Sequence, residues 1–219
     1  RLSSPSLPER LKPEISLREH QLHGVAWLQH LFELSPEHVS GCLLADDMGL
    51  GKTIQLLTFV VDYLERQPSG DPVLIVAPVS LLDNWEAELR KFFYADDIAV
   101  MRLYGDALSE AKFRSYEIPE SLRQQGVTNL LRPGWLQEAR IVLTTYETLR
   151  SQEISLGRQS WAMVICDEAQ KIKNPAAMVT RAIKAMKSRF RIACTGTPVE
   201  NTLIDLWSLF DFVQPGLLG

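Results

Sequence analysis

Residues 44–55 read LADDMGLGKTIQ, a short apolar run followed by a glycine-rich turn. Gly49 and Gly51 let the backbone turn tightly and point successive N–H groups at phosphate oxygens. Lys52 would then reach the β- and γ-phosphates of a nucleotide, and the Thr53 hydroxyl would ligate Mg²⁺. The generic phosphate-loop pattern G-x-x-x-x-G-K-[ST] has glycine where this chain has Asp46. Taken alone, the stretch leaves open a structural turn that merely ends in GKT.

A second polar cluster ends another apolar run, in WAMVICDEAQ at residues 161–170. Two adjacent acids after a buried strand can take two different catalytic roles. Asp167 would hold Mg²⁺ through its water shell, and Glu168 would activate the attacking water as a general base. Phosphoryl transfer asks a protein chiefly for positioning and charge neutralisation. Together, the two stretches predict a nucleotide-hydrolysing site far more specifically than either one alone.

Apolar runs alternate with helical patterns along the chain, which predicts an α/β fold with a mostly parallel sheet covered on both faces. The expected strands are 42–45, 73–78, 100–104, 139–145, 161–166 and 190–197. The expected helices include 17–32, 53–66, 81–93 and 175–187. Ligands of such sheets bind at the carboxyl ends of the strands, where both polar clusters fall.

The domain organisation follows from composition. Residues 1–16 are rich in proline and serine and are expected to form a linker or N-terminal arm. Residues 17–219 are expected to form one domain, in which the less regular stretch 106–138 is an irregular or helical insertion.

Composition also narrows the class of protein. The chain has 219 residues, 46% of them hydrophobic, and no apolar run near the roughly 18 residues of a membrane helix. Its N-terminus lacks the apolar segment of a signal peptide. Cys42, Cys166 and Cys194 lie far apart in apolar runs and are expected to be reduced and buried. We therefore expect a cytoplasmic protein, associated with the nucleoid if prokaryotic, with no membrane partner.

Two further patterns each allow a structural and a functional interpretation. The net charge is −4, yet residues 171–191 carry seven cations and no acid. That run is either a solvated face or a polyanion site. His20 and His23 could share a metal, but no acidic or thiol partner stands at matching spacing, so two helix-borne histidines are the better interpretation.

LADDMGLGKTIQ and DEAQKIKN resemble motifs I and II of the SWI/SNF-type ATPases, a branch of helicase superfamily two. That branch usually has aspartate-glutamate-methionine before GLGKT, so Asp46 is expected there, and Asp47 is a minor departure. The resemblance implies a RecA-like P-loop lobe, a three-layer sandwich that uses ATP and Mg²⁺. The implied nucleotide-binding residues of this loop are Asp47, Met48, Gly49, Leu50, Gly51, Lys52 and Thr53, with Thr53 and Asp167 as Mg²⁺ ligands.

Three more stretches resemble other motifs of the family. LREHQLHGVAWL (17–28) is similar to the adenine-reading Q motif, which places Gln21 on the base, although an exposed helix glutamine is the alternative. LIVAPVSLLDNWEAELRKF and IVLTTYETL resemble motifs Ia and Ib, which contact the DNA backbone in the family. The residues implied for DNA contact are Ser80, Asn84, Thr144 and Thr145. Each Ser or Thr alone would more often cap a helix, and Trp85 is expected to be packed.

ACTGTPVENTLIDLWSLFDF (193–212) resembles motif III and the signature that follows it in this family, particularly in bacterial and archaeal members. It implies that Thr195, Gly196 and Thr197 couple the phosphate site to movement of a partner lobe. Gln170 stands where many eukaryotic relatives have histidine. It would hydrogen-bond across the γ-phosphate site beside Lys52, Asp167 and Glu168 without titrating near neutral pH.

The resemblance implies the N-terminal ATP-binding lobe of a double-stranded-DNA translocase that remodels protein–DNA complexes. Family members continue into a C-terminal lobe, for which no candidate region is present here, so the isolated lobe is expected to be weakly active or inactive. The implied partners are duplex DNA, that second lobe, and DNA-bound proteins such as RNA polymerase. The alternatives are a strand-separating helicase lobe, a nucleotide-gated binding module without turnover, and a metabolic P-loop kinase.

Overall fold

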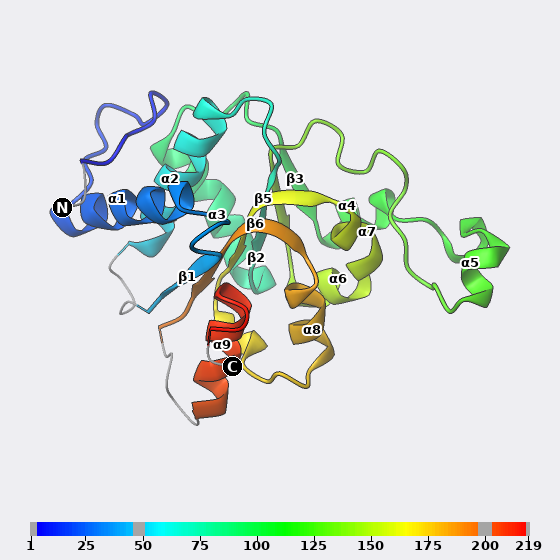
Figure 1. Cartoon of the computed structure of the whole chain (residues 1–219). Coiled ribbons are helices and arrows are strands. Elements are labelled where there is room, and N and C mark those ends of the chain that lie inside the picture. Colours follow the sequence, from blue (N-terminus) through cyan, green and yellow to red (C-terminus); the bar gives the residue numbers. More distant parts are fainter. Residues whose placement is uncertain (1–3, 46–50, 197–202, 218–219) are drawn as a thin grey trace.

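A single six-stranded sheet organises the computed structural model, which describes residues 4–45, 51–196 and 203–217 (Figure 1). The strand order is β1-β6-β5-β2-β4-β3, and every neighbouring pair among the described residues is parallel. The strands are β1 Gly41–Leu44, β2 Val73–Val76, β3 Val100–Leu103, β4 Ile141–Thr144, β5 Ser160–Cys166 and β6 Lys187–Cys194. The predicted α/β fold is confirmed, with a sheet that is parallel throughout.

Helices cover both faces of this sheet and give the expected three layers. One face packs against α1 Glu19–Glu33, α2 Lys52–Arg66 and α3 Val79–Phe92. The other packs against α6 Tyr146–Ser151, α7 Glu153–Arg158, α8 Met178–Lys184 and α9 Leu203–Val213. Because both faces are covered, β2 and β4 are buried at every position, which explains their unbroken apolar runs.

The expected strands are all present, with shifts at their ends. The last one runs over 187–194 rather than 190–197, since Thr195 already belongs to the loop at the carboxyl edge. Helix α8 is shorter than the predicted 175–187. Before it, Asn174 folds into a turn in which its side-chain oxygen accepts a hydrogen bond from the Ala176 N–H, at 3.0 Å.

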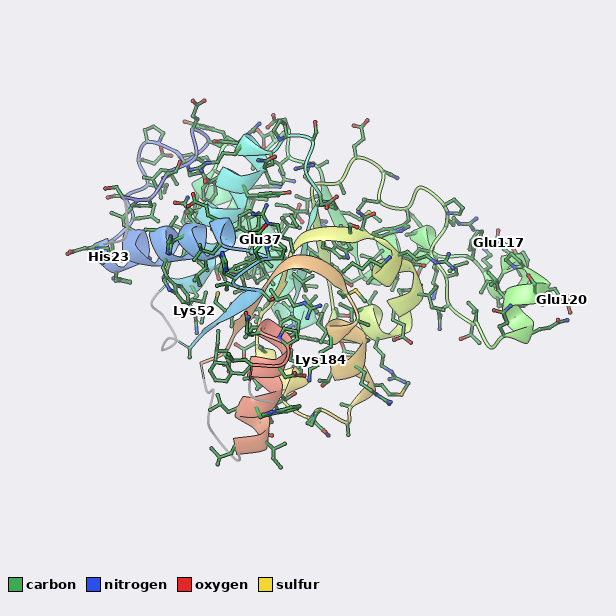
Figure 2. All side chains as sticks on the ribbon, in the orientation of Figure 1. His23, Glu37, Lys52, Glu117, Glu120 and Lys184 are labelled. Atoms are coloured by element: carbon green, nitrogen blue, oxygen red, sulfur yellow. The ribbon has the colours of Figure 1, made fainter. Side chains whose placement is uncertain are left out.

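Residues 105–138 run from the edge strand β3 to β4 and carry only short helices. These are α4 Gly105–Ala111, the 3₁₀ helix η1 Ser115–Glu117 and α5 Glu120–Gln124. Figure 1 shows α5 far from the sheet, and Figure 2 places Glu117 and Glu120 on this outlying part. We call residues 105–138 the excursion. An antiparallel bridge between Lys112 and Leu131 joins the two chain segments at its base.

The N-terminal arm lies against the domain over residues 6–12. Ser6 donates from its hydroxyl to Asp62 at 2.9 Å, and the backbone N–H groups of Glu9 and Arg10 donate to Glu65. The Arg10 guanidinium pairs with Asp97. Further along, the Lys12 N–H donates to the Phe92 carbonyl at 3.0 Å. The arm therefore contacts α2, the end of α3 and the turn before β3.

The three cysteines are free and buried, as predicted. Burial raises the pKa of the Cys42 thiol to about 12, so it stays protonated at neutral pH. In the described part of the chain, we find no helix with the length and apolar character needed to span a bilayer.

Candidate functional site

A cleft of about 840 Å³ opens at the carboxyl edge of the sheet. Its walls come from the end of the N-terminal arm, the first turns of α1 and α2, the end of α3, and the loops after β5 and β6. It is lined by Glu14, Ile15, Ser16, Arg18, Gln21, Gly51, Lys52, Thr53, Ile54, Glu88, Phe92, Asp167, Glu168, Thr195 and Gly196. The topology thus brings both predicted polar clusters, which are far apart in the chain, to one cavity.

The start of α2 forms the side of this cleft where the sequence predicts phosphate binding. Gly51 is the N-cap residue, with φ of 75°, a left-handed conformation that favours glycine. Lys52 and Thr53 are the first residues of a 15-residue helix, so the backbone N–H groups of its first turn and the positive end of the helix dipole lie beside their side chains.

Gln21 lies directly against this turn. A Cβ atom added to Gly51 would fall 2.3 Å from the Gln21 amide nitrogen, so the end of the Gln21 side chain lies closely over this glycine. The Gln21 side-chain oxygen accepts a hydrogen bond from the Arg18 N–H at 2.8 Å, which closes the first turn of α1. Gln21 is buried and lines the cleft, rather than being an exposed helix residue.

Asp167 is held by contacts from three directions. Its Oδ1 accepts from the Glu168 N–H at 2.9 Å, and its Oδ2 accepts from the Trp85 indole N–H at 3.0 Å. The Tyr146 hydroxyl donates to its backbone carbonyl at 2.5 Å. Burial raises the pKa of the Asp167 carboxyl, and the hydrogen bonds from Trp85 and Glu168, with the charge of Lys52, oppose that rise.

Glu168 begins a hydrogen-bonded chain that reaches the loop after β6. Its backbone is left-handed, with φ of 50°, which is strained for a residue with a side chain. The Gln170 amide nitrogen donates to the Glu168 carboxylate, and the Gln170 oxygen accepts from the Thr195 hydroxyl at 3.1 Å. The side chains predicted as base, γ-phosphate contact and coupling residue therefore form one continuous chain.

The residues predicted for DNA contact fall into different environments. Ser80 and Asn84 are one helical turn apart on the same exposed face of α3. Thr144 is buried, and its hydroxyl donates to the Leu103 carbonyl at 2.9 Å. Thr145 caps α6, because its hydroxyl oxygen accepts from the Thr148 N–H at 3.0 Å. The alternative interpretation, a helix cap, thus describes Thr145, and the Thr144 side chain is turned into the core.

Several predicted residues lie outside the described ranges. They are Asp46, Asp47, Met48, Gly49, Leu50 and Thr197.

The basic run at 171–191 is neither a plain solvated face nor a uniform polyanion site. Lys173 pairs with Asp205 and Lys184 with Asp211, which ties η2 (Ala169–Ile172) and α8 to α9. Arg189 donates to the Phe32 carbonyl at the end of α1. Arg191 donates to carbonyls that include Phe212 in α9, and burial lowers its pKa. The exposed members are Lys171, Arg181, Lys187 and Arg189.

A second cleft, of about 860 Å³, lies between the N-terminal arm and the C-terminal end of α2. It holds charged side chains of both signs, such as Arg10, Glu65 and Arg140, already near one another. Gly51, Lys52 and the adjacent acids lie at the opposite edge of the sheet, so chemistry rather than size identifies the 840 Å³ cleft as the candidate site.

The sequence interpretation missed two contacts on Asp167. Trp85 was expected to be packed, and it is buried, but its N–H bond to Asp167 was not anticipated. The sequence patterns described above do not point to Tyr146. A usable signal exists for both, since a buried indole N–H or phenol hydroxyl needs a hydrogen-bond acceptor, and each residue follows a strand that ends at this edge.

The sequence profile of the SNF2-related domain matches residues 20–219. The chain belongs to this family. It is 62% identical over 219 residues to the Zorya protein ZorD of Escherichia coli O139:H28, covering 100% of this chain and 20% of that protein. It is 36% identical over 221 residues to the putative ATP-dependent helicase/translocase YwqA of Bacillus subtilis, covering 99% of the chain and 21% of that protein.

A solved structure agrees with the family assignment. The lobe superimposes on the Sulfolobus solfataricus SWI2/SNF2 ATPase core in complex with dsDNA with a TM-score of 0.74 and 35% identity, over 98% of this chain and 39% of that one. The RecA-like fold and the membership of the SNF2 family expected from sequence are thereby confirmed. The chain spans about a fifth of the length of these two curated relatives.

Proposed function

We propose that this lobe binds ATP and Mg²⁺ and, within a full-length protein, drives translocation on double-stranded DNA that remodels protein–DNA complexes. The observation that carries the proposal is the single cleft that joins Lys52 and Thr53 at the start of α2 to Asp167 and Glu168 after β5. Those four side chains are the parts that phosphoryl transfer needs from a protein.

The residues fit a bound Mg²⁺ ion. Magnesium in nucleotide sites is held by one or two carboxylates and hydroxyls together with substrate phosphates, and it keeps several waters. Asp167 and Thr53 line the same cleft and supply one carboxylate and one hydroxyl. When bound, the ion would neutralise charge that develops on the transferred phosphate.

The protein side chains then divide the chemistry. Lys52 and the N–H groups of α2 hold the phosphates, and Gln21 lies where an adenine base would enter past the Gly51 turn. Glu168 accepts the proton of the attacking water. Its chain through Gln170 to Thr195 links the γ-phosphate side to the loop after β6, which is suited to report nucleotide state to a partner lobe.

We infer that duplex DNA lies along the exposed start of α3 and beside the start of α6. The Sulfolobus ATPase core was solved in complex with dsDNA, which supports duplex rather than single-stranded nucleic acid. On α3, Ser80 and Asn84 offer a hydroxyl and an amide to phosphate oxygens. On α6, the Thr145 hydroxyl is occupied as a cap, so backbone N–H groups of the first turn are the better donors there.

The test is an ATPase assay of the full-length protein with no nucleic acid, duplex DNA, single-stranded DNA or RNA. We expect strong stimulation by duplex DNA. The variant Glu168→Gln should lose turnover by at least about 10²-fold, the lower range for removal of a general base, while it still binds nucleotide.

The other outcomes identify the rival functions. Preference for single strands or RNA would indicate a strand-separating helicase, and turnover of a small-molecule acceptor would indicate a kinase. Nucleotide binding without turnover under any condition would indicate a gated binding module. Robust DNA-stimulated turnover by residues 1–219 alone would contradict the proposal that a second lobe completes the site.

A further inference from the structure

Two helices on the proposed DNA side each place one aromatic side chain on the same acid. From α3, the Trp85 indole N–H donates to the Asp167 carboxylate at 3.0 Å. From α6, the Tyr146 hydroxyl donates to the Asp167 carbonyl at 2.5 Å. Both aromatic residues are almost fully buried, so neither has water as an alternative partner.

The sheet topology explains this convergence. Strand β2 lies between β4 and β5, so the helices that follow β2 and β4 begin beside the loop that follows β5. The Asp167 N–H donates to the Val76 carbonyl at 2.8 Å, which fixes the acid to the end of β2 itself. The start of α3 is therefore adjacent to Asp167.

The same helices carry the surface proposed for DNA. Ser80 and Asn84 are exposed on α3, and Trp85, next in sequence to Asn84, points inward from the same helix. On α6, Tyr146 follows the Thr145 cap directly. A movement of either helix start on DNA would move an aromatic hydrogen-bond donor by a similar amount.

We propose that Trp85 and Tyr146 are positioning residues that transmit duplex-DNA binding on α3 and α6 to Asp167. This inference rests on the proposed function and adds its regulation. Without DNA, small displacements of the two helix starts leave Asp167 less well oriented for the metal–phosphate group. With DNA, the helix starts are held, and the two hydrogen bonds fix the acid in the geometry that phosphoryl transfer requires.

The test uses two variants of the full-length protein, each with a matched control. Trp85→Phe removes the indole donor, and its control is Trp161→Phe, because the buried Trp161 indole donates to the Leu156 carbonyl at 3.1 Å, outside the cleft. Tyr146→Phe removes the hydroxyl, and its control is Tyr63→Phe, because the buried Tyr63 hydroxyl donates to the Asp71 carbonyl at 2.8 Å.

The first readout is the ratio of duplex-stimulated to basal ATPase rate. We expect each of Trp85→Phe and Tyr146→Phe to lower this ratio by at least about fivefold, the lower end of typical allosteric coupling, and the controls to leave it unchanged. A purely structural defect would lower both rates by one factor and keep the ratio.

The second readout needs no turnover. Coupling between two ligands is reciprocal, so duplex DNA and a non-hydrolysable ATP analogue should each tighten binding of the other by one factor in the wild-type protein. That factor should fall towards one in the two variants, while the affinity for DNA alone is retained.

The outcomes separate the inference from the proposed function. If the wild-type protein is stimulated by duplex DNA and the variants keep both ratios, the inference is overturned and the function stands. If the wild-type protein shows neither stimulation nor coupling, both are overturned. A loss in the controls equal to that in the variants would also overturn the inference.

Discussion

At the scale of residues, the two adjacent acids of the site differ in how the fold holds them. Asp167 is fixed by donors from α3, α6 and its own loop, whereas Glu168 stands in a left-handed conformation and contacts Gln170. Two neighbouring carboxylates that differ in this way suit the separate tasks of metal ligand and proton acceptor.

Glu86 provides a residue-scale prediction away from the site. It is buried on α3 and accepts hydrogen bonds from Arg90 at 3.1 Å and from Arg102 in β3 at 2.5 Å. We expect Glu86→Gln to lower the free energy of unfolding by about 1–3 kcal/mol at pH 7, measured by chemical denaturation of residues 1–219. As a control, Glu120→Gln removes an exposed pair with Arg123 and should cost about 1 kcal/mol or less.

The effect of Glu86 should depend on pH. Burial raises the pKa of this carboxyl, but the hydrogen bonds and charges of Arg102 and Arg90 outweigh it and lower the pKa below its ordinary value. A depressed pKa in the folded state stabilises the protein above the unfolded-state pKa of about 4.3, and this stabilisation is lost as pH falls further. The difference between wild type and Glu86→Gln should therefore shrink below about pH 4, and a constant difference would contradict this account.

At the scale of elements, the edge of the sheet at β1 depends on one glycine. A Cβ atom added to Gly41 would lie 2.1 Å from the Arg191 carbonyl oxygen in β6 and 2.7 Å from the Val213 carbonyl oxygen in α9. Both neighbours are backbone atoms, so they can move only if β6 or α9 moves. Gly41 is thus where three elements meet closely.

We expect Gly41→Ala to destabilise the lobe by about 1–3 kcal/mol, the usual cost of overpacking a core. The matched control is Gly157→Ala in α7, where the added Cβ would lie 3.7 Å from the Met186 methyl group, an ordinary contact. That change should be neutral or stabilising by up to about 1 kcal/mol, because alanine favours helix. Thermal unfolding of both variants measures the contrast, and equal stability would refute the crowding at Gly41.

The sequence predicted those elements and site residues whose chemistry appears in local patterns. The six strands and the Lys52, Thr53, Asp167 and Glu168 cluster are of this kind. The contact between Trp85 and Asp167 joins residues 82 positions apart, so it depends on strand order, which periodicity does not specify. Likewise, nothing local distinguishes buried Thr144 from exposed Ser80, and the cations of 171–191 find their partners on α9 and α1 only after folding.

At the scale of the whole molecule, the N-terminal arm connects the two clefts. Residues 6–12 contact the domain beside the second cleft, and residues 14–16 line the candidate-site cleft. We therefore expect the position of residues 14–16 in the candidate site to depend on contacts made at the opposite edge of the sheet.

This connection predicts a measurable effect of Arg10, which pairs with Asp97 and Glu65. We expect Arg10→Ala to weaken binding of a fluorescent ATP analogue by up to about fivefold, because exposed ion pairs contribute about 1 kcal/mol at most. Arg123→Ala, which removes an exposed pair on α5, is the control and should leave the affinity unchanged. If Arg10→Ala binds the analogue with unaltered affinity, the arm keeps its position without the Arg10 ion pairs.

The closed base of the excursion makes it a natural attachment point for engineering. Between Ala111 and Arg132 the two chain segments are joined by backbone hydrogen bonds, from Phe113 N–H to the Leu130 carbonyl at 2.8 Å and from Arg132 N–H to the Ala111 carbonyl at 2.9 Å. The chain therefore leaves and re-enters the lobe at nearly one place, so a fluorophore or an affinity peptide grafted near Glu120 would leave the sheet and the nucleotide cleft intact. A labelled lobe of this kind would let single molecules be followed while they work.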